Sequence, residues 1–283
     1  MSKIALITDT NSSLPVDISK KYDIVQIPIH IQFGEETYIT GETIDDRKLF
    51  ELIDERKVLP TTAAPSPGAF EAAYRDAFEK GADEVICVCC SSVVSATFTA
   101  AKMATEAFPE GKVSVVDSLM LSLAEGFQVL TAAEAIENGA SRDEALAMIE
   151  GLRGKTHVFA ALPTLKYLAM GGRMGKLAAG LADTMEIKPI LTMQEGKLDL
   201  LEKIRTLRKA KQRLLDLARE STAGSNIIKI GLIHVNNEQA AVDLFESLKE
   251  VLPISIEPII GEFTPGLSVH AGSGVIGFVL VTD

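Results

Sequence analysis

The chain has 283 residues, of which 47% are hydrophobic and 24% are charged, so it has the composition of a globular protein and the length for two domains with a sizeable core. Its formal net charge of −11 disfavours broad binding to nucleic acid or anionic membranes, because attraction to phosphate needs a basic surface. Apolar runs such as 227–235 and 275–281 fall far short of the roughly 20 residues that a membrane span requires.

The N-terminus and the cysteines both indicate a cytoplasmic protein. A strand pattern begins at residue 3, without the apolar core and the cleavage site of a signal peptide. The three cysteines, Cys87, Cys89 and Cys90, lie within one strand pattern, and no distant cysteine is available to pair with them. We therefore expect buried, reduced thiols rather than a disulfide or a metal site.

The first half of the chain alternates strand and helix patterns. Strands are expected at 3–8, 23–33, 84–90 and 112–116, and helices at 46–57, 70–80, 95–108, 119–137 and 142–152. Repeated strand–helix units predict a parallel, Rossmann-like sheet that is covered by helices on both faces.

The second half predicts a mixed sheet. Strands are expected at 157–161, 188–193, 196–201, 227–234, 254–260 and 275–281, and helices at 164–170, 176–182, 203–220 and 238–251. Glu195-Gly196 is typical of the turn of a hairpin. The periodicity is interrupted at 151–155, so the expected fold is α/β with two α/β domains, 1–154 and 155–283.

The segment 60–70 has no charged residue and lies between two charged helical patterns. It has three prolines and three hydroxyls, those of Thr61, Thr62 and Ser66, and no charge. Prolines stiffen a backbone and hydroxyls donate hydrogen bonds, so this segment is typical of a loop that holds donors against an anionic ligand head.

Polar residues also follow two of the expected parallel strands, at the edge where ligands bind in such sheets. Asp9 follows the first strand, where it could orient a ligand-contacting loop or, with the serines after it, cap the next helix near Pro15. Ser91, Ser92 and Ser95 surround an expected helix start, where hydroxyls and free N–H groups form an anion site. Helix capping explains one of these serines but does not need three.

Three further segments have both a binding and a structural interpretation. Gly171–Lys176 fails the phosphate-loop pattern, because Leu177 stands where Ser or Thr must hold magnesium, so Arg173 is either a solvated side chain or a glycine-flanked ligand contact. Residues 203–213 carry six cations and no acid, as a solvated helix face or a docking surface would. His270 lies in a glycine-rich turn, either as a structural residue or as a ligand contact.

Common signatures of hydrolases are absent. The sequence has no G-x-S-x-G elbow and no H-E-x-x-H pair, and the other histidines lie in strand patterns without the clustering of a metal site. No metal, cofactor or catalytic nucleophile is therefore expected.

The order of these motifs along the whole chain resembles the DegV family of bacterial fatty-acid-binding proteins. The matching segments are Thr8-Asp9-Thr10, Thr61–Pro67, Ser91–Phe98, Val116-Asp117-Ser118, Leu168–Lys176, Ile187–Ile190, Lys203–Thr206 and His270–Gly274. Each is weak alone, and their order makes the resemblance specific. Ala63, Ala64, Ala96, Phe98, Ala271 and Ser273 depart from the usual family residues.

The resemblance implies a long-chain fatty acid buried between two α/β domains. It assigns the carboxylate to the hydroxyls of Thr62 and Ser92, with Ser95 nearby, and it places Arg173, Arg205 and His270 at the basic mouth. It also implies a role as the acyl-carrying subunit of a fatty-acid kinase, whose partner subunit phosphorylates the carboxylate with ATP for phospholipid synthesis.

Two other classes of function remain open from the sequence. A phosphotransferase or hydrolase would use Asp9, Ser92 and His270 at the same site. A protein-interaction module would use the basic segment 203–213.

Overall fold

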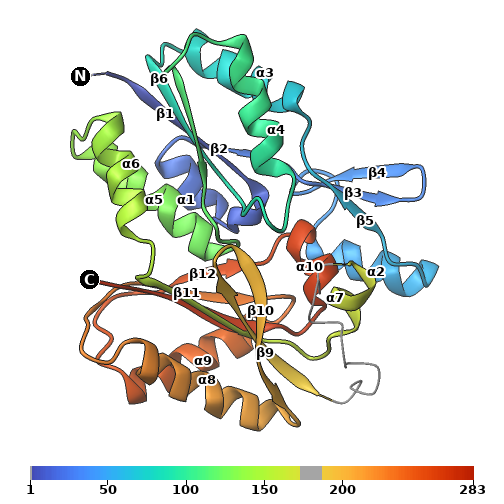
Figure 1. The fold of residues 1–283 in the computed structure, drawn as a ribbon. Coiled ribbons are helices and arrows are strands. Elements are labelled where there is room, and N and C mark those ends of the chain that lie inside the picture. Colours follow the sequence, from blue (N-terminus) through green and yellow to red (C-terminus); the bar gives the residue numbers. More distant parts are fainter. Residues whose placement is uncertain (1, 173–186) are drawn as a thin grey trace.

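Two β-sheets, one from each half of the chain, lie on either side of a buried helix in the computed structural model, which describes residues 2–172 and 187–283 (Figure 1). The helix is α5 (Leu123–Glu137), which contacts strands of both sheets. Among the described residues, no helix combines the length and the apolar character that crossing a membrane demands.

The first sheet is parallel throughout, as the sequence predicts. Its strand order is β2 (Ile24–Ile27), β1 (Ile4–Asp9), β6 (Glu84–Cys89) and β7 (Val113–Asp117). Helices α3 (Pro67–Glu79) and α4 (Thr97–Ala104) share a hydrophobic core with one face of this sheet. Helix α5 packs on the other face, where α6 (Arg142–Gly151) covers it in turn. Two short elements, α1 (Val16–Lys21) and the 3-10 turn η1 (Thr10–Ser12), connect β1 to β2.

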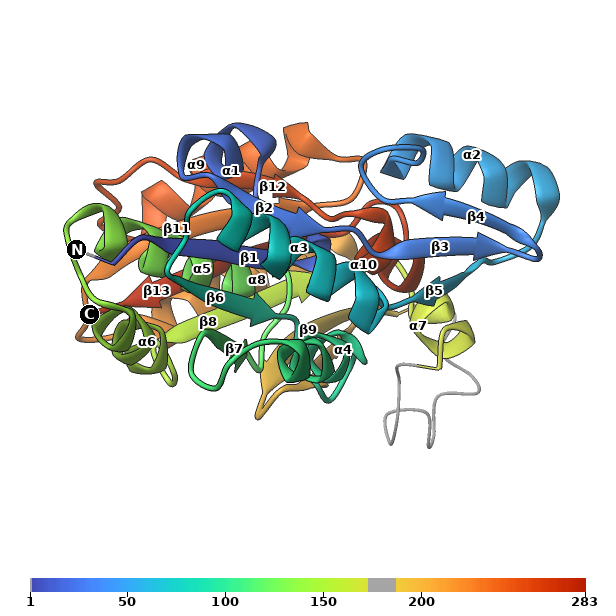
Figure 2. The same ribbon diagram turned by 90° about the horizontal axis from the view of Figure 1, so that it is seen from above.

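The single strand expected at 23–33 is wrong. The chain leaves the parallel sheet after Ile27, because Pro28 has no N–H with which to continue the ladder. It then forms a small antiparallel sheet, in the order β4 (Glu36–Ile39), β3 (His30–Phe33) and β5 (Thr61–Ala63), next to α2 (Asp46–Arg56). This excursion projects to one side of the molecule (Figure 2). Part of the expected loop at 60–70 is thus strand β5.

The second sheet is mixed, as expected, and only its β11–β12 pair is parallel among the described strands. Its order is β10 (Lys197–Ile204), β9 (Lys188–Gln194), β8 (Thr156–Ala161), β13 (Ile276–Thr282), β11 (Ile227–His234) and β12 (Ile259–Glu262). Helices α8 (Leu207–Ser221) and α9 (Glu238–Val251) cover one face. The short helices α7 (Lys166–Met170) and α10 (Pro265–Ala271) lie beside the excursion (Figure 1).

Several element boundaries differ from the sequence prediction for local reasons. Helix α8 begins at Leu207 because the Thr206 hydroxyl accepts from Lys209 N at 3.3 Å, which caps the helix there. The expected helix at 95–108 is α4 followed by the 3-10 turn η2 (Thr105–Ala107). Strand β12 begins only after Pro258, which cannot donate to a ladder.

Two parts of the prediction are not decided by these elements. The expected helix at 176–182 lies outside the described residues. The expected boundary between residues 154 and 155 falls in the connection from α6 to β8, and we retain it as a proposal.

Glycines let α5 approach the second sheet closely. A Cβ at Gly231 on β11 would lie 2.7 Å from Leu123 Cδ1, and one at Gly261 on β12 would lie 2.9 Å from Leu123 Cγ. Helix α5 is apolar on nearly all sides, which is typical of a helix that is buried all round. The layering of the molecule therefore depends on two positions without side chains.

Candidate functional site

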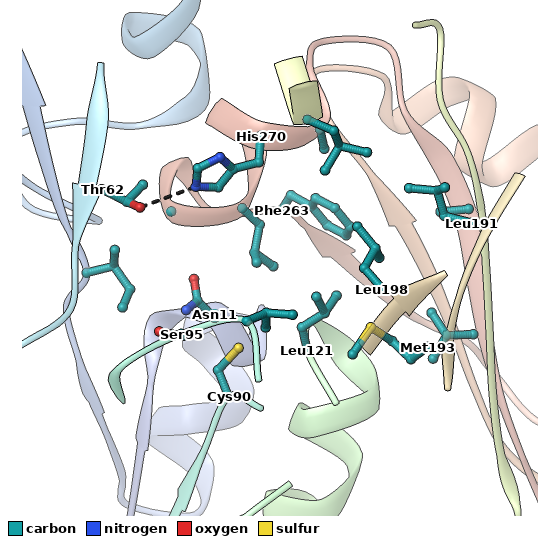
Figure 3. Close-up of a pocket in the computed structure, with 18 of the residues that line it drawn as sticks. Asn11, Thr62, Cys90, Ser95, Leu121, Leu191, Met193, Leu198, Phe263 and His270 are labelled. Carbon is teal, nitrogen blue, oxygen red and sulfur yellow. Dashed lines mark hydrogen bonds between the residues drawn. The ribbon is translucent and has the colours of Figure 1, made fainter. Parts of the chain in front are cut away.

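A cavity of about 210 Å³ lies where the carboxyl ends of the first sheet face the second sheet (Figure 3). Its wall is built from both halves of the chain. The lining residues used below are Asn11, Thr62, Cys90, Ser95, Leu121, Leu191, Met193, Leu198, Phe263 and His270. This position agrees with the rule that ligands bind outside the carboxyl ends of parallel strands.

The cavity is polar at one end and apolar at the other. Figure 3 shows Thr62, His270, Asn11, Ser95 and Cys90 toward one side. On the other side it shows aliphatic and thioether side chains that come mostly from the second sheet, namely Leu191, Met193 and Leu198. Such an arrangement suits a ligand with a polar head and a long apolar body.

Thr62 and His270 meet at the polar end although they are 208 residues apart in sequence. Thr62 Oγ1 lies 3.2 Å from His270 Nε2, and which atom donates depends on the tautomer of the ring. His270 was expected in a turn, which is wrong: it occupies the last turn of α10, and the chain breaks out of the helix at Gly272 with a φ of 86°.

Helix α10 is held by a buried hydrogen bond. Ser268 Oγ donates to Asp46 Oδ2 at 2.6 Å, which joins α10 to the start of α2. Burial raises the pKa of Asp46 to about 8, and the bond from Ser268 only partly offsets this. Two elements that are distant in sequence thus fix the orientation of His270.

The three candidate serines have different environments. Ser95 lines the cavity and its hydroxyl accepts from Thr97 N at 3.3 Å, just before α4. Ser91 is buried and donates to Gly196 O at 2.7 Å, which fastens the tip of the β9–β10 hairpin. Ser92 is exposed and is not among the lining residues. The structure therefore brings Ser95, but not Ser92, to the cavity beside Thr62.

Asp9 supports the polar end from behind without lining it. It is fully buried and accepts from Asn11 N and from Cys90 N, each at 2.9 Å. It thereby caps η1 and ties η1 to the loop that follows β6. The predicted capping of the helix near Pro15 is wrong, because that helix, α1, has no side-chain cap. Burial raises the pKa of Asp9 to about 6, although these two hydrogen bonds lower it.

The two arginines that the resemblance places at the mouth have different outcomes. Arg173 lies outside the described residues, and Arg205 is exposed and does not line the cavity. The basic segment is not uniform, because Arg213 pairs with Glu202 at 2.7 Å and with Glu220 at 2.6 Å. The exposed cations of the segment are Lys203, Arg205, Arg208 and Lys209.

Comparison with known proteins identifies the chain. The family model described as "Uncharacterised protein, DegV family" matches residues 3–283. The chain belongs to the DegV family. The resemblance inferred from the sequence motifs is thereby confirmed.

Relatives of known structure share the whole DegV fold. A DegV-family protein from Thermus thermophilus, described as fatty acid binding, is 33% identical with a TM-score of 0.93, over 99% of this chain and 100% of that one. DegV of Bacillus subtilis, described as a fatty acid binding protein, is 30% identical with a TM-score of 0.89, over 100% of both chains. In a comparison of sequence alone, the chain is also 31% identical to a DegV domain-containing protein of Streptomyces coelicolor, over 98% of both chains.

In this DegV-family chain, Asn11 and Cys90 line the polar end of the cavity, although the sequence analysis named neither as a ligand contact. Asn11 and Cys90 each follow a parallel strand, and strand-end position was the signal that could have found them. The prediction of buried thiols is confirmed for Cys87, Cys89 and Cys90. Burial raises the pKa of the Cys90 thiol, so it faces the cavity as a small neutral side chain.

Proposed function

We propose that this protein binds one long-chain fatty acid in the cavity, with the carboxylate at the polar end and the acyl chain against the apolar end. The observation that carries the proposal is the separation of Thr62, Ser95 and His270 from Leu191, Met193 and Leu198 within one cavity. The fatty-acid binding of relatives at 30% and 33% identity supports the same conclusion.

The acyl tail and the carboxylate head of the ligand contribute different free energies to binding. Each buried methylene contributes roughly 0.8 kcal/mol, so about 14 methylenes offer on the order of 11 kcal/mol before the costs of ordering. A neutral hydroxyl bond contributes about 1 kcal/mol net. The acyl chain therefore supplies affinity, and the hydroxyls of Thr62 and Ser95 orient the carboxylate, which would be costly to bury without donors.

We further propose that the bound carboxylate is presented to a fatty-acid kinase subunit, which phosphorylates it to an acyl phosphate. Support comes from the exposed cations Lys203, Arg205, Arg208 and Lys209, which have no acid between them in a protein of net charge −11. Such a patch fits an acidic surface on a partner. This proposal needs no cofactor bound to the chain itself.

The described geometry favours a carrier over an enzyme. A phosphotransferase or hydrolase would need Asp9, Ser92 and His270 together, yet Asp9 is fully buried behind the cavity and Ser92 is exposed outside it. Catalysis is therefore assigned to the partner kinase.

Native mass spectrometry tests the binding proposal. The purified protein is expected to have one bound ligand of a few hundred daltons, because a tail buried in the cavity dissociates slowly. Delipidated protein should take up palmitate or oleate in a one-to-one ratio. A protein that is free of ligand as purified and takes up neither acid would contradict the proposal.

Arg205→Ala tests the docking proposal. The variant is expected to bind fatty acid as the parent does, because Arg205 does not line the cavity. Phosphorylation of the bound acid by a fatty-acid kinase should fall several-fold, chiefly through weaker association. Arg219→Ala, a change of an exposed cation on α8 outside the basic segment, is the matched control and should leave both measurements unchanged. Loss of lipid binding with normal docking would refute this division of roles.

A further inference from the structure

The two consecutive glycines after α7 have different backbone conformations. Gly172 has a φ of 69°, in the left-handed region that favours glycine, so the backbone itself accounts for this glycine. Gly171 has a φ of −77° and a ψ of −3°, which residues with a side chain also adopt. The backbone therefore does not require a glycine at 171, and the contacts around it have to supply the reason.

The imidazole of His270 lies directly against Gly171. A Cβ at residue 171 would be 2.2 Å from His270 Nδ1 and 3.0 Å from His270 Cε1, whereas carbon atoms in contact are about 3.5–4.0 Å apart. The other ring nitrogen of His270, Nε2, lies 3.2 Å from Thr62 Oγ1 (Figure 3). The ring is thus held between the backbone at the end of α7 and the Thr62 hydroxyl.

The end of α10 makes the reciprocal contact with α7. Gly272 follows α10, and a Cβ there would be 2.5 Å from Cδ2 and 2.8 Å from Cε2 of Tyr167 on α7. Tyr167 also meets Phe50 of α2 edge-on, with the ring centroids 6.2 Å apart. Each of the two short helices therefore ends at a glycine against which a ring of the other helix packs, and α2 supports the pair.

The geometry points to Gly171 as a positioning residue, whose lack of a side chain lets α7 hold the His270 imidazole in the orientation that reaches Thr62 at the polar end of the cavity. Its effect on the ligand rests on the proposed function, because it acts through the contact of His270 with the carboxylate. Its effect on the orientation of the ring does not.

An alanine at 171 is expected to move the ring and leave the fold intact. The atoms that the new Cβ would strike belong to the end of a side chain that can rotate about χ1 and χ2, whereas the nearest backbone atom, Tyr167 O, would be 3.2 Å away. Helix α10 is held independently by its buried hydrogen bond to α2. Gly171→Ala should therefore fold, with His270 Nε2 beyond hydrogen-bond distance of Thr62 Oγ1.

A crystal structure of Gly171→Ala tests the position of the ring and needs no ligand. Gly151→Ala is the matched control, because Gly151 is also at the C-terminal end of a helix, α6, and a Cβ there meets nothing within 4 Å. The imidazole should be displaced in Gly171→Ala and unchanged in Gly151→Ala. An imidazole that still reaches Thr62 in Gly171→Ala would overturn the inference.

The double variant Gly171→Ala with His270→Ala keeps the inference falsifiable if Gly171→Ala does not fold. Replacing His270 removes the atoms that the new Cβ would strike, so the double variant should fold as His270→Ala does. A double variant that is unfolded while His270→Ala is folded would overturn the inference, because the collision at residue 171 would then not be with the imidazole.

Equilibrium titration with palmitate tests whether Gly171 acts through His270. Gly171→Ala should weaken binding about 10-fold, as expected for the loss of a hydrogen bond to a charged acceptor, and Gly151→Ala should not. Adding Gly171→Ala to His270→Ala should cause no further loss, because no ring remains to be displaced.

Two results of this titration would contradict the inference. Palmitate binding as tight in Gly171→Ala as in the parent would show that residue 171 does not position the head-group contact. Weaker binding in the double variant than in His270→Ala would show that Gly171 acts by another route. If the parent itself bound no palmitate, the proposed function would fail, while the crystal structure would still decide the position of the ring.

Discussion

Leu198→Trp is expected to weaken the binding of long-chain fatty acids on the order of 100-fold. Leu198 projects into the apolar end of the cavity from β10, so an indole there occupies the space of several methylenes (Figure 3). Excluding about four methylenes costs roughly 3 kcal/mol at about 0.8 kcal/mol each, which is about a 100-fold change in the dissociation constant. Equilibrium titration of delipidated protein with palmitate measures the effect.

This experiment has two controls, a shorter fatty acid and a substitution at a neighbouring residue. A shorter acid, which does not reach Leu198, should bind the variant nearly as well as the parent. Leu201→Trp changes the same strand at a side chain that is 40% exposed, so it should leave palmitate binding unchanged. If Leu198→Trp bound palmitate as tightly as the parent, the acyl chain would not occupy the apolar end of this cavity.

Gly231→Val is expected to destabilise the fold by about 1–3 kcal/mol, the usual cost of inserting atoms into a packed core. The new side chain would collide with Leu123 and Phe127 of α5, because a Cβ alone already approaches them within 2.7 and 3.1 Å. Leu123→Ala should cost about 2–5 kcal/mol by leaving a cavity in the same place. Denaturant unfolding of both variants measures these free energies.

The double variant tests whether the two residues meet. Since the valine methyl groups would enter the space that Leu123 vacates, Gly231→Val with Leu123→Ala should cost less than the two single changes added together. Ile228→Val, on the same strand at a residue that is 47% exposed, is the control and should change stability little. If the losses in the free energy of unfolding were additive in the double variant, α5 would not pack against Gly231.

The two sheets and the family motifs were predictable because their signals are local. Alternating strand and helix patterns predicted a parallel first sheet and a mixed second sheet, and both are confirmed. The motif order indicated the DegV family, which the match over residues 3–283 confirms. Helix α5 could be recognised as buried because its apolar residues occupy almost every face.

Local patterns failed where long-range packing competes with them. The run at 23–33 is strand-like throughout, but Pro28 divides it and the second part pairs with β5, about 30 residues later along the chain. His270 lies beside glycines that favour a turn, yet α10 forms there because it is buried against α2 and β3. Tertiary burial outweighed the local propensity in both cases.

By itself the sequence determined the class of fold, the family and the residue types available to a ligand, because periodicity and motif order are properties of neighbouring residues. The tertiary structure decided which candidates share a cavity: it joins Thr62 to His270 across 208 residues, brings Ser95 to them and leaves Ser92 outside. These pairings depend on how the two sheets pack around α5, and no pattern among neighbouring residues encodes that packing.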